Sequence, residues 1–81
     1  MYFIEFSKES KKFIKKLNKH EADIILNKVY SMRENPFRNL KRLQGNKLWR
    51  LRIGSYRAVV DVIVLKNKIY VVRIGKRSRV Y

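Results

Sequence analysis

The sequence contains no cysteine and only one histidine, His20, in 81 residues. Without cysteine the chain cannot form a disulfide, a thiolate nucleophile or a cysteine-based zinc site, and a single imidazole excludes a histidine pair. Acidic residues are also scarce, because six Asp and Glu stand against 21 Lys and Arg. Paired-carboxylate and two-metal nuclease chemistry therefore lack their usual groups. We predict no metal site and no small-molecule cofactor.

Long apolar runs and glycine-rich loops are absent as well. The longest apolar runs, such as 62–65, have four residues, whereas a membrane-spanning helix needs about 20. The three glycines are isolated from one another, so no phosphate-binding glycine loop is present. The first residues lack the basic and apolar regions of a signal peptide. These features predict a cytoplasmic protein with no membrane contact.

Positive charge is abundant and unevenly distributed along the chain. The formal net charge is +15. Residues 1–35 carry eight Lys or Arg against five acids, whereas residues 36–81 carry thirteen against one, Asp61. Arginine predominates in the second part, and its planar guanidinium suits bidentate phosphate contacts and stacking. The excess predicts a polyanionic or acidic partner for residues 36–81. The alternative is that the arginines only keep a sheet face soluble.

Residues 1–35 show one strand-like and two helix-like segments. The aromatic and β-branched segment 2–6 predicts a short strand. Ser7 is a candidate N-cap for a helix of about twelve residues. A second amphipathic helix is expected from about Glu21, and Asn35 followed by Pro36 ends it.

The second part predicts strands, because the apolar period changes to two after a polar loop at 36–47. The expected strands are 49–53, 56–65 and 69–74. Gly75 should end the last of them. The chain is therefore expected to form one α+β domain of order β-α-α-β-β-β: an N-terminal strand, a helical hairpin packed on one face of the sheet, and a three-stranded antiparallel meander. The N-terminal strand is expected to join one edge of the sheet.

This meander brings basic residues together on one sheet face or rim. The expected cluster consists of Arg50, Arg52, Arg57 and Arg77, with Arg73 nearby. Arg79 and Tyr81 follow in a basic tail. Interleaved arginines and aromatics suit RNA, since guanidinium groups hold phosphates and planar groups stack on unpaired bases. Chance clustering is the competing explanation for so basic a segment.

Three motifs in order resemble the RelE/ParE toxin superfamily. They are Leu43-Gln44-Gly45, the strand that runs into Gly54-Ser55-Tyr56-Arg57, and Gly75-Lys76-Arg77 followed by Tyr81. The resemblance implies a toxin of a type II toxin–antitoxin pair. RelE-like members cut mRNA in the ribosomal A site, whereas ParE-like members inhibit DNA gyrase and lack the catalytic basic set. This chain resembles the RelE branch because it retains the basic and tyrosine positions.

The resemblance also implies roles for individual residues. Arg57 would hold the scissile phosphate, and Arg77 would act as general acid or stabilise charge on the leaving 5′ oxygen. Tyr81 would take part in catalysis or base stacking, while Arg50 and Arg52 occupy two basic strand positions. Further RNA contacts are expected from Lys47, Arg73, Lys76 and Arg79.

Two departures from well-studied members affect the expected mechanism. Gln44 stands where those members have arginine, and Arg50 and Arg52 stand where they often have lysine. Arginine stays protonated far above neutral pH, so it is a poor general base and should instead stabilise transition-state charge. Tyr81, with Lys76 in reserve, is the better candidate for proton transfer.

The expected activity is ribosome-dependent, metal-free cleavage of mRNA by attack of a 2′-OH on the adjacent phosphate. The implied partners are mRNA in the ribosomal A site and a cognate acidic, RelB-like antitoxin. The alternatives are a ParE-like gyrase inhibitor and a non-catalytic module that binds RNA or the ribosome.

Overall fold

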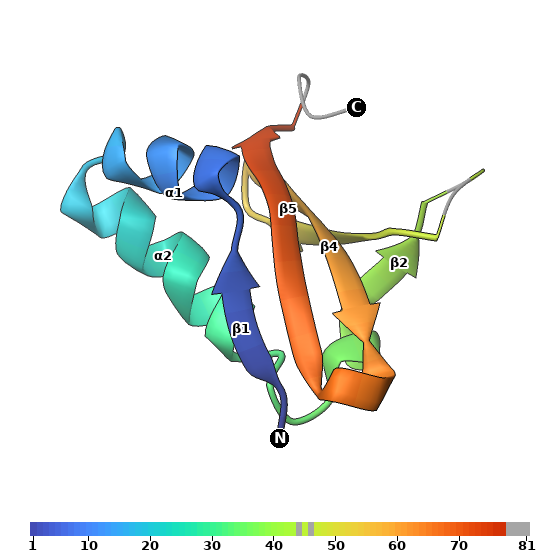
Figure 1. Ribbon diagram of the computed structural model, residues 1–81. Coiled ribbons are helices and arrows are strands. Elements are labelled where there is room, and N and C mark those ends of the chain that lie inside the picture. The colour runs from blue at the N-terminus through green and yellow to red at the C-terminus, as the bar shows by residue number, and fades with distance from the viewer. Residues whose placement is uncertain (44, 46, 78–81) are drawn as a thin grey trace.

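The computed structural model describes residues 1–43, 45 and 47–77. Its elements are β1 (Phe3–Phe6), α1 (Lys8–Lys15), α2 (Lys19–Tyr30), β2 (Leu40–Arg42), β3 (Trp49–Ile53), β4 (Tyr56–Ile63) and β5 (Lys68–Lys76). Short 3-10 turns occupy Pro36–Arg38 and Val64–Lys66. The two helices cover one face of a five-stranded sheet (Figure 1), which confirms the predicted two-layer α+β fold.

Side-chain caps set where the two helices begin. The Ser7 hydroxyl accepts a hydrogen bond from the Ser10 amide at the start of α1. The Asn18 side chain accepts one from the Glu21 amide, so α2 begins at Lys19, two residues before the predicted start. Helix α1 has eight residues, shorter than predicted, and α2 ends at Tyr30, well before Pro36.

The sheet has the order β1-β5-β4-β3-β2. Strands β3, β4 and β5 form the predicted antiparallel meander, and β1 lies at one edge, parallel to β5. The sheet is therefore mixed. Strand β2 pairs antiparallel with β3 at the other edge, within the segment that was predicted to be a loop. Its three residues are too few to show a period of two in the sequence.

Two strand ends differ from their predicted positions. Strand β4 ends at Ile63, where a 3-10 turn leads to Asn67 in the left-handed region, with φ of 50°. Strand β5 continues through Gly75 to Lys76, because Gly75 pairs with Arg57 of β4 and stays within the ladder. The prediction that Gly75 ends the strand was wrong.

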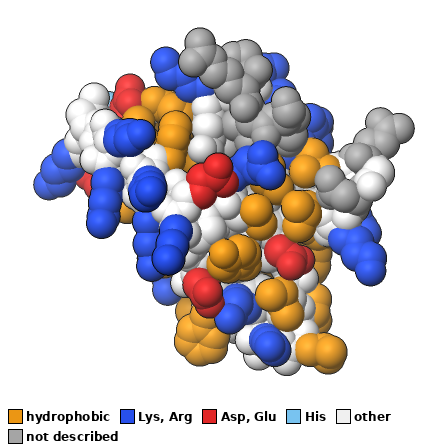
Figure 2. Space-filling model, turned by 45° about the horizontal axis from the view of Figure 1, so that its top comes forward, with side chains coloured by type: hydrophobic (Ala, Val, Ile, Leu, Met, Phe, Trp, Pro, Cys, Tyr) orange, Lys and Arg blue, Asp and Glu red, His pale blue; other side chains and the backbone are white. Residues whose placement is uncertain are grey.

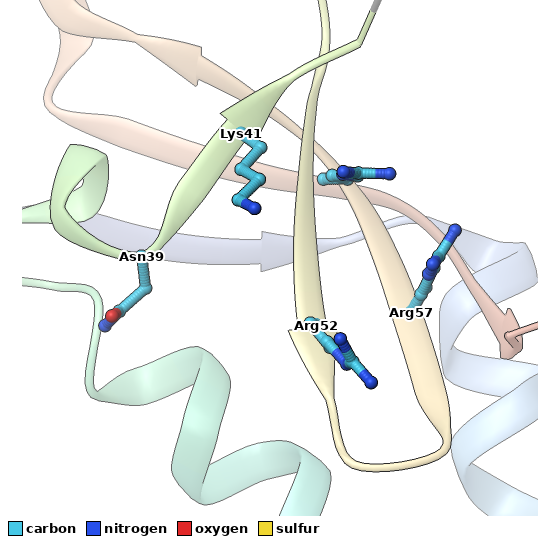
Figure 3. Close-up of a pocket in the computed structure, with 5 residues that line it drawn as sticks. Asn39, Lys41, Arg52 and Arg57 are labelled. Carbon is cyan, nitrogen blue, oxygen red and sulfur yellow. The ribbon is translucent and has the colours of Figure 1, made fainter.

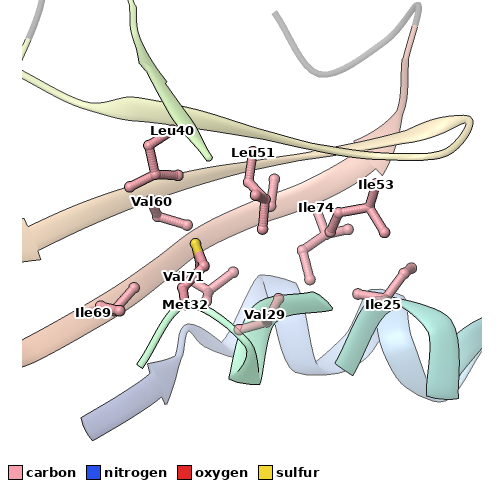
Figure 4. Close-up of a cluster of buried hydrophobic side chains, with 11 residues drawn as sticks. Ile25, Val29, Met32, Leu40, Leu51, Ile53, Val60, Ile69, Val71 and Ile74 are labelled. Carbon is pink, nitrogen blue, oxygen red and sulfur yellow. The ribbon is translucent and has the colours of Figure 1, made fainter. Parts of the chain in front are cut away.

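The hydrophobic core lies between the sheet and the helices (Figure 4). It is formed by inward-facing residues of the strands, by one side of α2 and by Met32 just after that helix: Ile25, Val29, Met32, Leu40, Leu51, Ile53, Ala58, Val60, Ile69, Val71 and Ile74. Two serines tie α1 to β5. The Ser7 hydroxyl donates to the Val72 carbonyl at 2.6 Å, and the fully buried Ser10 hydroxyl donates to the Val71 carbonyl at 3.1 Å.

Within the described part of the chain, no helix is both long enough and apolar enough to cross a membrane.

Candidate nucleic-acid interface

The face of the sheet opposite the helices carries the basic side chains. Neighbouring residues of a strand point to opposite faces. Leu51 and Ala58 face the core, so Arg50, Arg52 and Arg57 face away from it. The register places Arg52 directly opposite Arg57, and Lys41 of β2 directly opposite Arg50. Three adjacent strands thus present cations on one surface.

These side chains surround a small hollow of about 80 Å³. Its lining residues are Asn39, Lys41, Arg50, Arg52 and Arg57. Figure 3 shows Asn39 projecting from the segment before β2, Lys41 from β2 itself, and Arg52 and Arg57 from the β3–β4 hairpin. Because one ordered water needs only about 10–15 Å³ of such space, the hollow has room for several oxygen atoms, such as those of a phosphate group.

The lining of the hollow has four cationic side chains and no carboxylate among the residues that the structure describes. Like charges at this spacing repel one another, and a bound anion relieves that repulsion. The ion pair between Lys68 and Glu5, at 2.9 Å, lies at the other end of β5, so it does not offset the charge of the hollow. The hollow is therefore suited to an anion that accepts several hydrogen bonds.

Arg73 extends the same face along β5, and Arg77 lies just beyond the end of that strand. Arg73 lies opposite Val59, one strand further from Arg50. Arg77 follows the end of β5, and its amide donates to the Ser55 carbonyl at 2.9 Å. This bond fixes the Arg77 backbone beside the β3–β4 turn, two residues beyond the partner of Arg57.

The other predicted residues lie elsewhere or outside the described residues. Lys76 pairs with Tyr56 in the β4–β5 ladder, at a register position of the helix-covered face. Lys47 is exposed in the connection before β3 and does not line the hollow. Arg79, Tyr81 and Gln44 fall outside the residues that the structure describes.

Sequence reasoning missed four residues of this region. Asn39 and Lys41 line the hollow because β2 exists, and the alternation of buried Leu40 with exposed Lys41 was the available signal. Tyr56 and Glu21 form the other pair, since the Tyr56 hydroxyl donates to Glu21 Oε2 at 2.7 Å. That bond to a carboxylate, with partial burial, raises the pKa of Tyr56, so its phenol stays protonated.

The remaining surface offers no cluster of metal-ligating groups. Among the described residues, no three His, Asp or Glu side chains lie close enough to hold a metal ion, and His20 is exposed near the start of α2.

Figure 2 shows Lys and Arg side chains along the helical side at the left, and hydrophobic side chains with acidic ones between them at the lower right.

The fold and this face define a small basic α+β protein whose open sheet surface carries a cluster of cationic side chains. The sequence pattern of the family described as the ParE toxin of type II toxin–antitoxin systems, parDE, matches residues 4–81. The chain thus belongs to the RelE/ParE superfamily of type II toxins.

Curated relatives and solved structures agree with this assignment. The mRNA interferase toxin RelE of Escherichia coli K12 is 30% identical over 86 residues, covering 96% of this chain and 85% of the relative. The toxin of the intact E. coli RelBE complex superposes with a TM-score of 0.81 at 27% identity, covering 98% of this chain and 100% of the other. A chain of the Mycobacterium tuberculosis RelBE2 complex superposes with a TM-score of 0.85 at 18% identity, covering 94% of this chain and 98% of the other. At this identity the similarity shows a shared fold alone.

Proposed function

We propose that this protein is a ribosome-dependent mRNA endoribonuclease, the toxin of a toxin–antitoxin pair. The observation that carries the proposal is the hollow on the open sheet face, where Arg50, Arg52 and Arg57 converge with Lys41. A similar protein of E. coli is named an mRNA interferase toxin, which supports the same activity here.

The proposed reaction is transfer of a phosphodiester within the RNA. The 2′ oxygen of a nucleotide loses its proton and attacks the adjacent phosphorus, and the bond from phosphorus to the 5′ oxygen breaks. That leaving oxygen takes up a proton, so the products are a 2′,3′-cyclic phosphate and a 5′-OH end. The proposed reaction uses no metal ion.

The guanidinium groups supply charge stabilisation in this reaction. Arg57 holds the scissile phosphate, while Arg50 and Arg52 bind the oxygens that gain charge in the transition state. Arg77 serves the leaving 5′ oxygen from its place beside the β3–β4 turn. Proton transfer falls to Tyr81, because arginine is too weak an acid to lose its proton near neutral pH. Lys76 lies at a register position of the helix-covered face, away from the hollow, so we assign it no part in proton transfer. Lys47, Arg73 and Arg79 contact the RNA backbone.

Dependence on the ribosome follows from this choice of groups. The site is strong in fixed positive charge and poor in acid–base groups. The cleavage rate of such a site should rise most when the ribosome bends the message and aligns the 2′ oxygen with the phosphorus. Orientation of the reacting groups can lower the barrier by several kcal/mol, about 7–11 in favourable cases. We therefore expect slow cleavage of free RNA and fast cleavage in the A site.

The proposed second partner is an acidic antitoxin. The similar structures include RelB–RelE complexes from E. coli, M. tuberculosis and Pyrococcus horikoshii. The net charge of +15 suits a partner that places carboxylates near Arg50, Arg52 or Arg77. Binding of the acidic protein encoded beside this one should weaken as salt rises, and salt-independent binding or no binding would contradict the proposal.

Gyrase inhibition is the second candidate, because the matching family pattern carries the ParE name. Toe-printing on translating ribosomes separates the two activities. The wild type should cut message at the A-site codon, whereas Arg57→Ala and Tyr81→Phe should cut far more slowly. DNA damage signalling with intact message would favour gyrase inhibition, and ribosome binding without cleavage would favour a non-catalytic module.

A further inference from the structure

One carboxylate of the helical layer bonds to a side chain of the hairpin that carries the site. Glu21 lies in the first turn of α2, and its Oε2 accepts the 2.7 Å hydrogen bond from the Tyr56 hydroxyl. The two residues are 35 positions apart in the chain. The pair therefore links the helical layer to the hairpin through one partly buried hydrogen bond.

Tyr56 is held from two sides at the start of β4. Its ring packs edge-on against Phe13 of α1, with centroids 5.8 Å apart, while its hydroxyl is bonded to α2. Across the sheet it pairs with Ile53 on β3 and with Lys76 on β5. Its position is thus fixed by both helices and both neighbouring strands.

The residues on either side of Tyr56 carry or hold groups of the site. Arg57 follows it and points to the opposite face, into the hollow. Ser55 precedes it, and the Ser55 carbonyl accepts the bond from the Arg77 amide. A shift of Tyr56 would therefore move the Arg57 backbone directly and the Arg77 backbone through Ser55.

We propose that Glu21 and Tyr56 are positioning residues, whose hydrogen bond sets the relative placement of Arg57 and Arg77 for RNA cleavage. This rests on the function proposed above. Neither residue lines the hollow, so neither is expected to touch RNA. Their effect should appear in the rate of the chemical step, because small displacements of charged groups cost rate more than binding.

The test compares single-turnover cleavage on programmed ribosomes for four variants. Tyr56→Phe removes only the hydroxyl, Glu21→Ala removes the acceptor, and Glu21→Gln keeps an acceptor oxygen. Asp23→Ala is the matched control, because it removes an exposed acid two residues after Glu21 in the same helix. Tyr56→Phe and Glu21→Ala should each lower the rate at saturating ribosomes about tenfold, with little change in the half-saturating concentration. Glu21→Gln and Asp23→Ala should stay near the wild-type rate.

Amide hydrogen exchange at Arg77 gives a readout that does not need cleavage. Its exchange should speed up about tenfold in Tyr56→Phe and Glu21→Ala, relative to a core amide such as Leu51. If the wild type cuts no message, the proposed function fails and exchange alone decides this inference. The inference would be overturned if folded Tyr56→Phe cleaved message and exchanged its Arg77 amide at the wild-type rates. It would also be overturned if the loss of cleavage rate were no larger than the loss of folded protein that urea unfolding measures.

Discussion

The helical part, residues 1–35, and the strand part, residues 36–77, use positive charge differently. In the helical part most lysines are exposed on or beside α1 and α2, and acids such as Glu9 and Asp23 stand among them. In the strand part three arginines and a lysine meet in one hollow. Flexible, hydrated lysines on a helix keep the protein soluble, whereas arginines on a rigid sheet are already oriented for an anion.

The two parts are nevertheless one folding unit. Leu51 of β3 is fully buried in the same cluster as Ile25 and Val29 of α2. Replacing Leu51 with Ala should lower the free energy of unfolding by about 2–5 kcal/mol, because a cavity is left in the shared core. Urea unfolding measures this change in the free energy of unfolding. Lys15→Ala, at an exposed position, is the control and should change that free energy by no more than roughly 0.5 kcal/mol. A loss confined to the strands would show that the parts unfold separately.

Removing one positive charge should lower the cleavage rate strongly in the strand part and hardly at all in the helical part. Arg57→Ala should lower the cleavage rate on ribosomes about 10²–10³-fold, the usual loss when one transition-state donor is removed. Lys12→Ala removes the same charge from the outer face of α1 and should leave the rate within about twofold. Equal losses would mean that total charge, and not the geometry of the hollow, drives activity.

The caps of the two helices should differ in strength. Asn18→Ala should destabilise the protein by about 1 kcal/mol, the usual value for a lost N-cap. Ser7→Ala should cost more, because Ser7 also donates to the Val72 carbonyl of β5. Thermal or urea unfolding of the two variants checks the order. Equal losses would mean that the Ser7 bond to β5 adds nothing to the cap.

The smallest expected effect concerns the ion pair of Glu5 on β1 with Lys68 on β5. The hydrogen bond and the positive charge of Lys68 lower the pKa of Glu5. A carboxyl whose pKa is depressed by folding contributes stability above its unfolded pKa and loses it as the pH falls through the folded value. Glu5→Gln should therefore flatten the acid limb of the stability profile slightly, whereas an unchanged limb would mean that the exposed pair adds no stability.

Local patterns were sufficient to predict most of the fold. The period of two at Trp49–Ile53 and the serine cap of α1 both correspond to observed elements. Strand β2 has three residues and gains its stability from pairing with β3, which a local pattern cannot show. The prediction that Gly75 ends β5 was wrong because a glycine can stay within a strand when its backbone pairs with the neighbouring strand, as Gly75 does with Arg57.

The candidate site was predictable where it follows from strand alternation. Arg50 and Arg52 alternate with core residues, so their shared face could be expected. The place of Lys41 depends on β2, and the bond between Glu21 and Tyr56 joins residues far apart in the sequence. Such a tertiary hydrogen bond leaves no periodic signal, because each partner is chosen by the fold and not by its neighbours in the chain.

The most direct test of the central claim uses a message with a single 2′-deoxy nucleotide at the A-site position that is cut in the all-RNA message. Reverse transcription on programmed ribosomes locates the break. The wild-type protein should cut the all-RNA message, leave a 5′-OH end, and fail to cut the 2′-deoxy message, because the attacking oxygen is missing. Equal cleavage of the two messages would contradict attack by the 2′-OH and the role assigned to the arginine hollow.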